Sequence, residues 1–289
     1  MMKWTTVVLF VLCGAVASCQ TSAPQRRPGA LPATLRDEGG PEMILIAAGE
    51  FLMGSTQEDD DWVVKTTGVE GWRGIAKSEP RRMVNLPAFY IGKYEVTNQE
   101  YKNFVVGTGH RTPGIEGLST AYDWSNGSYP PSLATHPVVL ISRGDAELYC
   151  QWLSKRTGKR YRLPMQEEWE KAASWDERNK VKRRYPWGNE YNPGRGYGQV
   201  SAGEIMDTVH TMPVGSVAFD QSPYGVYDMG ENVAEWVAAS GGVTLKGGSF
   251  ATLETKYSIL DARCANSWGY PPDDKGRHVW RGFRVAREP

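Results

Sequence analysis

Reactive side chains are few in this chain of 289 residues, and they lie far apart in it. Beyond the first twenty residues the thiols and imidazoles are those of Cys150, Cys264, His110, His136, His210 and His278. None has the spacing of a zinc site, and the sequence has no glycine-rich phosphate loop and no G-x-S-x-G nucleophile elbow. Two cysteines can form a disulfide in an oxidising compartment, but sequence alone cannot pair them. The spacing favours solvated or structural histidines over a metal cluster.

The first residues have the pattern of an export signal. Lys3 precedes an apolar stretch at 6–16, which is too short to cross a bilayer as a helix of about 20 apolar residues. The stretch leads into Val-Ala-Ser-Cys, which ends at Cys19 and resembles the bacterial lipobox. We therefore expect a lipoprotein signal peptide at 1–18 and a diacylglycerol on Cys19. The alternative is an ordinary secretory signal, with an accidental thiol at this cysteine.

A tether is predicted after the signal. Residues 19–41 are rich in proline and glycine and poor in large apolar side chains, so this segment is expected to be flexible. Gln20 stands where an aspartate would indicate retention at the inner membrane. We therefore expect a lipid-anchored protein of the bacterial cell envelope, held in the outer membrane and facing the periplasm.

The composition predicts one large, loop-rich domain over residues 42–289. Lys+Arg and Asp+Glu are equal at 33 each, so the net charge gives no reason to expect nucleic acid as a partner. Glycine, proline and tryptophan are abundant, with 32, 18 and 11 residues, while long helical periodicity is scarce. Such a body would be held together by aromatic packing, and its length allows a proper core.

Secondary structure can be assigned only in places. The apolar stretches 43–54 and 82–96 predict strands interrupted by turns. A Thr-x-x-Glu capping box at Thr97 predicts a short helix, and a second helix should begin at Ser142 with Cys150 on its buried stripe. A third helix should follow Pro164. Its predicted inner face is Met165, Trp169, Ala172 and Ala173. Its predicted outer face is Gln166, Glu167, Glu168, Glu170 and Lys171.

Many short stretches resemble the formylglycine-generating enzymes, the sulfatase-modifying factor family. In chain order they include FLMGS at 51–55, EPRR at 79–82, FYIGKYEVTN at 89–98, HPVV at 136–139, RLP at 162–164, YPWGN at 185–189, YGVYDM at 224–229, KGGSF at 246–250 and RGFR at 281–284. No single stretch is specific to the family, but all of them occur in the family's order, and together they extend over nearly all of residues 43–287. The resemblance implies the α+β, C-type-lectin-like fold of that family, which is low in regular secondary structure.

The resemblance also implies that the family's copper chemistry is absent. Its catalytic members oxidise a cysteine of a client sulfatase with O₂, using Cu(I) held by two cysteines, and thiolates are the ligands that Cu(I) prefers. The corresponding positions here are Thr252 and Tyr257. The tryptophan of the family's Trp-Glu-Trp is Ala234, while Ser249 is retained in a Gly-Gly-Ser turn. We therefore expect no copper.

The same comparison bears on the two cysteines. Some members pair the cysteine matching Cys150 with a position that is Val285 here, and the one matching Cys264 with a position that is Ala173. This chain has only one of the two cysteines of each disulfide, so the resemblance implies two separate, buried, inert thiols. The related iron-dependent sulfoxide synthases require a His-x₃-His-x-Glu ligand set, which this sequence lacks.

A calcium site is the cofactor that the resemblance implies. Carried over by position, the ligands are the carboxylates of Asp228 and Glu235 and the backbone carbonyls of Glu231 and Val233. Glu231 replaces the usual glycine, and the alternative is a capped loop without metal. The segment 266–280 is either a new binding surface or an ordinary exposed loop.

Two functional hypotheses follow. The first is a membrane-tethered binding or accessory protein whose cleft holds an envelope protein or peptide. The second is an enzyme of different chemistry on the same fold, such as a periplasmic siderophore-maturing oxidase. In that case Glu254 and Tyr257, with Ser249 as a further cleft candidate, would be the residues to test for acid–base chemistry.

Overall fold

The computed structural model describes residues 1–2, 31–68, 76–191, 205–239, 242–251, 255–268 and 275–289. The chain divides into two compact units, Met1–Leu31 and Pro32–Pro289, and every element below belongs to the second. Within the described ranges, no helix has the length and apolar character needed to cross a membrane. Cys19, residues 3–18 of the predicted signal and residues 20–30 of the predicted tether lie outside the described residues.

The largest sheet has five antiparallel strands. Their order across the sheet is β1 (Thr34–Arg36), β2 (Glu42–Ile46), β6 (Phe89–Gly92), β14 (Ala286–Arg287) and β7 (Tyr161–Arg162). The prediction of a flexible tether through residue 41 is wrong for β1, which pairs with β2. Leu35 packs against the main core, and the Tyr161 hydroxyl donates to Asp37 at 2.6 Å. These contacts offset the chain entropy on which the prediction relied.

Four smaller sheets complete the β structure of the described residues. β10 (Ala234–Ala239) pairs antiparallel with β11 (Gly242–Lys246) and parallel with β13 (Arg281–Gly282). The antiparallel pairs are β3 (Gly49–Met53) with β5 (Arg82–Leu86), β12 (Asn266–Trp268) with β4 (Ala76–Ser78), and β8 (Trp175–Asp176) with β9 (Val181–Lys182). The strands expected at 43–54 and 82–96 are therefore confirmed as β2, β3, β5 and β6.

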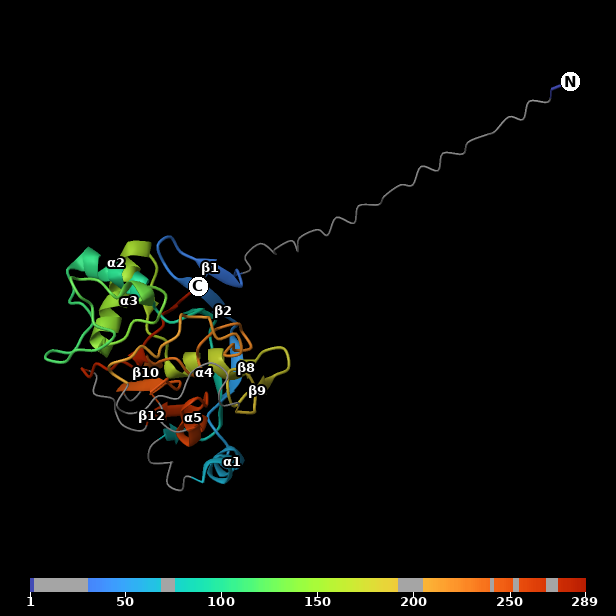
Figure 1. The fold of residues 1–289 in the computed structure, drawn as a ribbon. Coiled ribbons are helices and arrows are strands. Elements are labelled where there is room, and N and C mark those ends of the chain that lie inside the picture. The colour runs from blue at the N-terminus through green and yellow to red at the C-terminus, as the bar shows by residue number, and fades with distance from the viewer. Residues whose placement is uncertain (3–30, 69–75, 192–204, 240–241, 252–254, 269–274) are drawn as a thin grey trace. The chain divides into compact units, whose positions relative to one another are not determined.

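The helices are short and mostly capped. They are α1 (Gln57–Thr67), α2 (Asn98–Thr108), α3 (Arg143–Thr157), α4 (Gln166–Ser174) and α5 (Thr255–Asp261), with a 3-10 turn at Pro131–Leu133. Capping boxes at Thr56, Thr97 and Ser142 open α1, α2 and α3. The predicted starts of α2 and α3 are confirmed. Figure 1 shows α2 and α3 at one end of the domain, α1 and α5 at the other, and α4 between them.

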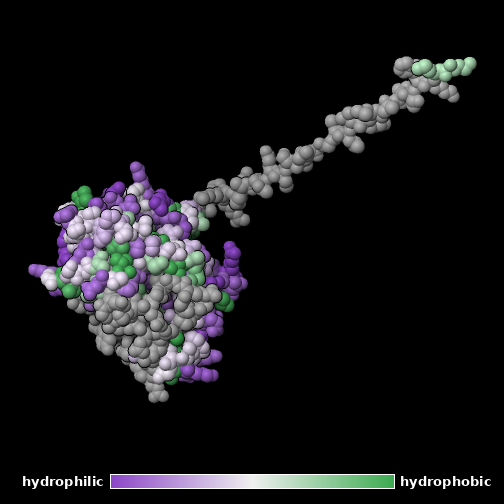
Figure 2. All heavy atoms as spheres, in the orientation of Figure 1, coloured by the Kyte–Doolittle hydropathy of each residue, from purple (hydrophilic) through white to green (hydrophobic). Residues whose placement is uncertain are grey.

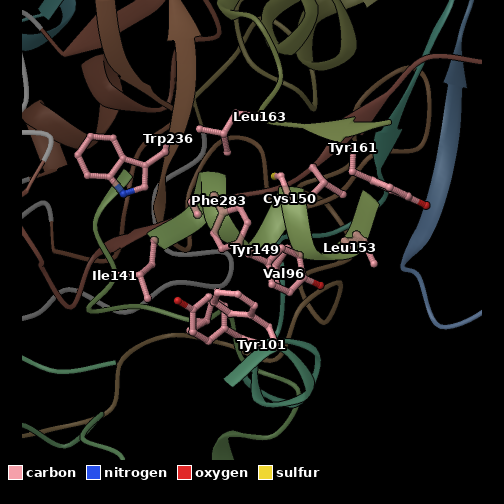
Figure 3. Close-up of a cluster of buried hydrophobic side chains, with 14 of the residues drawn as sticks. Val96, Tyr101, Ile141, Tyr149, Cys150, Leu153, Tyr161, Leu163, Trp236 and Phe283 are labelled. Carbon is pink, nitrogen blue, oxygen red and sulfur yellow. The ribbon is translucent and has the colours of Figure 1, made fainter. Parts of the chain in front are cut away.

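The main core forms where α2 and α3 meet the sheets. The predicted buried stripe of α3 is confirmed, because Ala146, Tyr149, Cys150 and Leu153 are all buried. The Tyr149 ring stacks on Tyr101 of α2, with ring centroids 5.7 Å apart, and meets the edge of Phe283 at 5.4 Å (Figure 3). Figure 2 shows a face of mostly hydrophilic residues, with apolar residues in small groups between them.

Helix α4 corrects the sequence prediction. Trp169, Ala172 and Ala173 are buried as expected, but so are Gln166, Glu168, Glu170 and Lys171, while Met165 is exposed. The physical reason is that α4 is covered on several sides, by β3, β8, β10 and β11. Only Glu167 of the predicted outer face is partly exposed.

Each buried polar group on α4 has a specific partner. Glu168 accepts two bonds from the guanidinium of Arg162, at 2.6 and 2.7 Å. Lys171 donates to the carbonyl oxygens of Ala47 and Gly49, at 2.7 and 2.9 Å. Glu170 accepts from the ammonium groups of Lys182 and Lys246. These partners allow α4 to be a central helix although its sequence is rich in charge.

Candidate functional site

The position of the family's second copper cysteine is partly covered by α1. Thr252 and Glu254 lie outside the described residues, but Tyr257 is on α5. It packs in an apolar cluster whose other members are Trp62, Val63, Val64 and Leu260. A phenol in contact with α1 therefore stands at the position that the resemblance assigns to the family's second copper thiolate.

The other two positions in this site are buried. Ser249 follows β11 and is 6% exposed, and its hydroxyl has no hydrogen-bond partner within the described part of the chain. Ala234 opens β10 and is fully buried. Among the described residues, no general base is hydrogen-bonded to the Ser249 hydroxyl, as one would be in an activated serine nucleophile.

Glu235, an expected calcium ligand, is held by an arginine. Arg284 is fully buried and donates to both carboxylate oxygens of Glu235, from Nε at 2.7 Å and from Nη2 at 2.6 Å. Trp169 Nε1 adds a third bond, at 3.0 Å. Arg284 also donates to the carbonyl oxygen of Tyr227 at 2.9 Å, so this pair ties β10 to the loop before it.

A second buried carboxyl, Glu95, lies beside this pair. It is 2% exposed, and neither of its oxygens has a hydrogen-bond partner among the described residues. Burial, followed by the negative charge of Asp228, raises the pKa of Glu95 well above its usual value. Asp220, also buried, has its pKa raised by burial and again by Asp228. Carboxyl groups therefore outnumber cations here.

The donor types around Asp228 suit calcium in part. Asp228 is buried in a left-handed conformation (φ 58°), and its Oδ2 accepts from the backbone N–H of Gly215 at 2.6 Å. The side chain of Glu231 accepts a hydrogen bond from the Tyr191 hydroxyl at 3.1 Å. Glu95 adds two oxygens without donors, and hard oxygen ligands are those that calcium prefers. Across the described ranges, no three His, Cys, Asp or Glu side chains are grouped to hold a metal.

The histidines are dispersed, as their spacing indicates. His110 bonds to Asp145 at 2.9 Å, His136 bonds to Thr211 at 2.9 Å, and His210 stacks on Phe250. Arg277 also bonds to Asp145, at 2.7 Å, which attaches part of the 266–280 segment to the start of α3. Other members of that segment, namely Tyr270, Asp273, Asp274 and the side chain of Trp268, lie outside what the structure describes.

The two cysteines are separate and buried, as the resemblance implied. Cys150 lies in the core around α3 (Figure 3) and Cys264 follows α5, and both are free thiols. Burial raises the pKa of each thiol far above its usual value, so neither is a nucleophile at neutral pH.

Comparison with known proteins identifies the family. The model of the sulfatase-modifying factor enzyme 1-like domain matches residues 29–289. The chain therefore belongs to that family, and the predicted C-type-lectin-like α+β fold is confirmed. The solved structure of PvdO from Pseudomonas aeruginosa is similar, with a TM-score of 0.62 and 28% identity over 92% of this chain and 100% of that one.

Relatives in the family differ in activity. The chain is 29% identical to the bovine (Bos taurus) formylglycine-generating enzyme over 78% of its length, and it spans 64% of that protein. It is 28% identical to the mouse (Mus musculus) inactive C-alpha-formylglycine-generating enzyme 2, with 85% of each chain covered. It is 30% identical to hercynine oxygenase of Mycobacterium tuberculosis, over 57% of this chain and 41% of that one.

Sequence reasoning missed Glu95 and Arg284 as neighbours of the predicted calcium loop. Glu95 lies beyond β6, which ends at Gly92, and no sequence pattern predicted its burial. Arg284 gave no signal either, since its partner Glu235 lies 49 residues away in the chain.

Proposed function

We propose that this chain is a lipid-anchored accessory protein of the bacterial cell envelope whose domain binds an envelope protein or peptide and does not act as a copper formylglycine-generating enzyme. The observation that carries the proposal is Tyr257, a phenol packed against α1 where the family's chemistry needs a thiolate. Phenol and hydroxyl oxygens are poor Cu(I) ligands, and neither can exchange with a substrate thiol. The inactive mouse relative shows that the family includes proteins named as lacking this activity.

Two measurements test the loss of copper chemistry. The purified chain, supplied with Cu(I) and O₂, is expected to leave a sulfatase-type cysteine peptide unconverted, while an active family member converts it under the same conditions. The chain should also bind no stoichiometric Cu(I). Detectable aldehyde formation, or tight copper binding that the Tyr257→Phe variant weakens, would contradict the proposal.

The anchor and the partner are tested separately. Labelled palmitate should be incorporated into the wild-type protein in cells and be absent from Cys19→Ala, which should leave the membrane fraction. Cross-linking in intact cells should then recover one envelope protein in stoichiometric amount. A labelled Cys19→Ala variant would refute the anchor. Failure to recover any partner from the wild-type protein would refute the accessory role.

The alternative is an enzyme of different chemistry on this fold, of the siderophore-maturing oxidase type. It is favoured by one finding, since a hercynine oxygenase is among the relatives. Under this alternative, Glu254→Ala or Tyr257→Phe would stop product formation while folding and partner capture remained intact. If those variants merely weaken a complex, the accessory role gains support.

We also propose that calcium stabilises the loop around Asp228. Its ligands would be the carboxylate of Asp228 and the carbonyl oxygens of Glu231 and Val233. Because the negative charge of Glu235 is paired with Arg284, Glu95 would supply the second negative charge near the calcium ion. Calcium should raise the melting temperature of the chain relative to EGTA, and magnesium should do so less. Equal melting temperatures in calcium and EGTA would refute this site.

A further inference from the structure

A small basic pocket lies where the start of α1 meets the end of β9. Its cations are Arg81, Lys182, Arg183, Arg184 and Arg263. Two of these side chains are almost wholly buried, with exposed fractions of 6% for Lys182 and 1% for Arg263. The cavity has a volume of about 30 Å³, which is room for about two water molecules or for one group of similar size.

The carboxylates around this pocket are fewer than the cations. Asp59 is shared by Arg81 at 2.5 Å and Arg184 at 3.3 Å. Glu170 is shared in the same way by Lys182 and Lys246, the latter at 3.0 Å.

The remaining two cations each pair with a carboxylate among the described residues. Arg183 pairs with Asp176 at 3.1 Å, and Arg263 pairs with Asp60 at 3.3 Å. Among the described residues, these ion pairs set six cations against four carboxylates. Buried or half-buried charge in excess of its partners is costly, and an anion would offset that cost.

Hydrogen-bond donors are also available in the pocket. Arg184 Nε is buried and has no partner among the described residues. The Ser55 hydroxyl accepts from Arg263 at 2.7 Å and still has its own proton to donate. Guanidinium groups bind phosphate through paired N–H donors, so the chemistry of the pocket suits an oxyanion better than a halide.

A wider pocket of about 430 Å³ adjoins this one and shares Asp59, Arg81 and Arg184 with it. Its wall includes Trp62, whose ring lies under the Arg184 guanidinium at 3.9 Å. Glu58, Asp61 and Lys65 line only the wider pocket, so the charged groups found there alone are two carboxylates and one ammonium. An anionic head would therefore lie at the small end, and the rest of the ligand, neutral or cationic, would lie along α1.

We infer that this pair of pockets binds a dianionic phosphate group, either as the free ion or as a monoester with a neutral or cationic body. The small basic pocket receives the phosphate, and the wider pocket receives the body of an ester. This site adjoins the Tyr257 position, because Trp62 lines the wider pocket and packs in the same cluster as Tyr257. It goes beyond the proposed function, so it stands whether the chain is an accessory protein or an enzyme.

The test is calorimetric titration of the full chain, in non-ionic detergent and chloride buffer of constant ionic strength, with inorganic phosphate and with phosphoethanolamine. We expect saturable binding, weakened about tenfold or more in Arg81→Gln, the loss typical of one charge-assisted hydrogen bond. Arg82→Gln is the matched control, because Arg82 is the next residue, carries the same charge and does not line the pocket. It should change the Kd by less than about twofold.

A second variant should strengthen phosphate binding instead of weakening it. Asp59→Asn removes the carboxylate that competes with the ligand for Arg81 and Arg184, so phosphate should bind more tightly than to the wild type. Tighter binding of phosphoethanolamine than of phosphate supports an ester, and binding of phosphate alone supports the free ion. The inference is overturned if neither probe binds saturably, if Arg81→Gln and Arg82→Gln weaken binding equally, or if a folded Asp59→Asn variant binds phosphate less tightly.

Discussion

Replacing Glu170 by glutamine tests the buried charges around α4. Glu170 is 1% exposed and accepts from Lys182, from Lys246 at 3.0 Å and from the backbone N–H of Gly54 at 2.7 Å. Burial by itself would raise the pKa of this carboxyl, but the two ammonium groups hold it at about 2, against an ordinary value of 4.5. A difference of that size corresponds to about 3 kcal/mol of stability at neutral pH.

The sign of the pH dependence follows from the lowered pKa. The stabilisation is complete above the ordinary pKa of 4.5 and is lost as the pH falls toward 2. About 2 kcal/mol of it should be gone by pH 3. Glu170→Gln leaves two buried ammonium groups facing an amide, so it should cost about 3–5 kcal/mol at pH 7. The gap between variant and wild type should narrow by about 2 kcal/mol at pH 3.

Urea unfolding followed by tryptophan fluorescence at pH 7 and pH 3 measures both quantities. Glu167→Gln is the matched control, since Glu167 lies on the same helix, is partly exposed and pairs with Arg82 at 3.6 Å. Its cost should stay within about 0.5 kcal/mol at either pH. If Glu170→Gln costs no more than Glu167→Gln, or if its cost is the same at both pH values, the buried network does not hold the charge that we assign to it.

Three further predictions concern the rest of the domain. Arg284→Met should lower the free energy of unfolding in urea by about 3–5 kcal/mol, because it leaves Glu235 unpaired in the core. The double variant with Glu235→Gln should recover part of that loss. No recovery would show that the loss of the ion pair is not the cause. The raised pKa of Glu95 favours its protonated form, so the stability it gives is present below its ordinary pKa and is lost as the pH rises through the raised value. Glu95→Gln, which mimics the protonated form, should therefore stabilise the calcium-free protein at pH 8 by about 1–3 kcal/mol and abolish stabilisation by calcium; destabilisation at that pH would contradict it. Cys150 and Cys264 should react with a thiol reagent only after unfolding in guanidinium, and fast labelling of the native protein would disprove their burial.

The buried side of α3 could be predicted from the sequence and that of α4 could not, for a physical reason. On α3 the apolar residues repeat at helical spacing and end at capping signals, so both its start at Ser142 and its buried side could be predicted. On α4 Glu170 and Lys171 were placed outside because charged residues are seldom buried. Their burial depends on partners such as Lys246, which lies 76 residues away in the chain.

The residue types of the candidate site could be predicted from the sequence better than their arrangement in space. The change from cysteine to Tyr257 could be read from the sequence, but its packing against α1 could not, because α1 is a local feature that the family motifs do not include. The basic pocket could not be predicted from the sequence, for the same reason as the buried charges around α4. Its cations come from separate segments, and the equal numbers of acidic and basic residues in the chain mask their local excess.

The place of β14 in the five-stranded sheet has a consequence for the order of events during biosynthesis. Ala286 lies between Ile91 of β6 and Arg162 of β7, so this sheet stays split in two until β14, which follows β7 by more than a hundred residues, has been made. Pairing across such long stretches of chain is slow and leaves strand edges open in the meantime. This sheet therefore cannot be completed before β14 is available, and the pairing of β14 is the step at which a chaperone would have the greatest effect on yield.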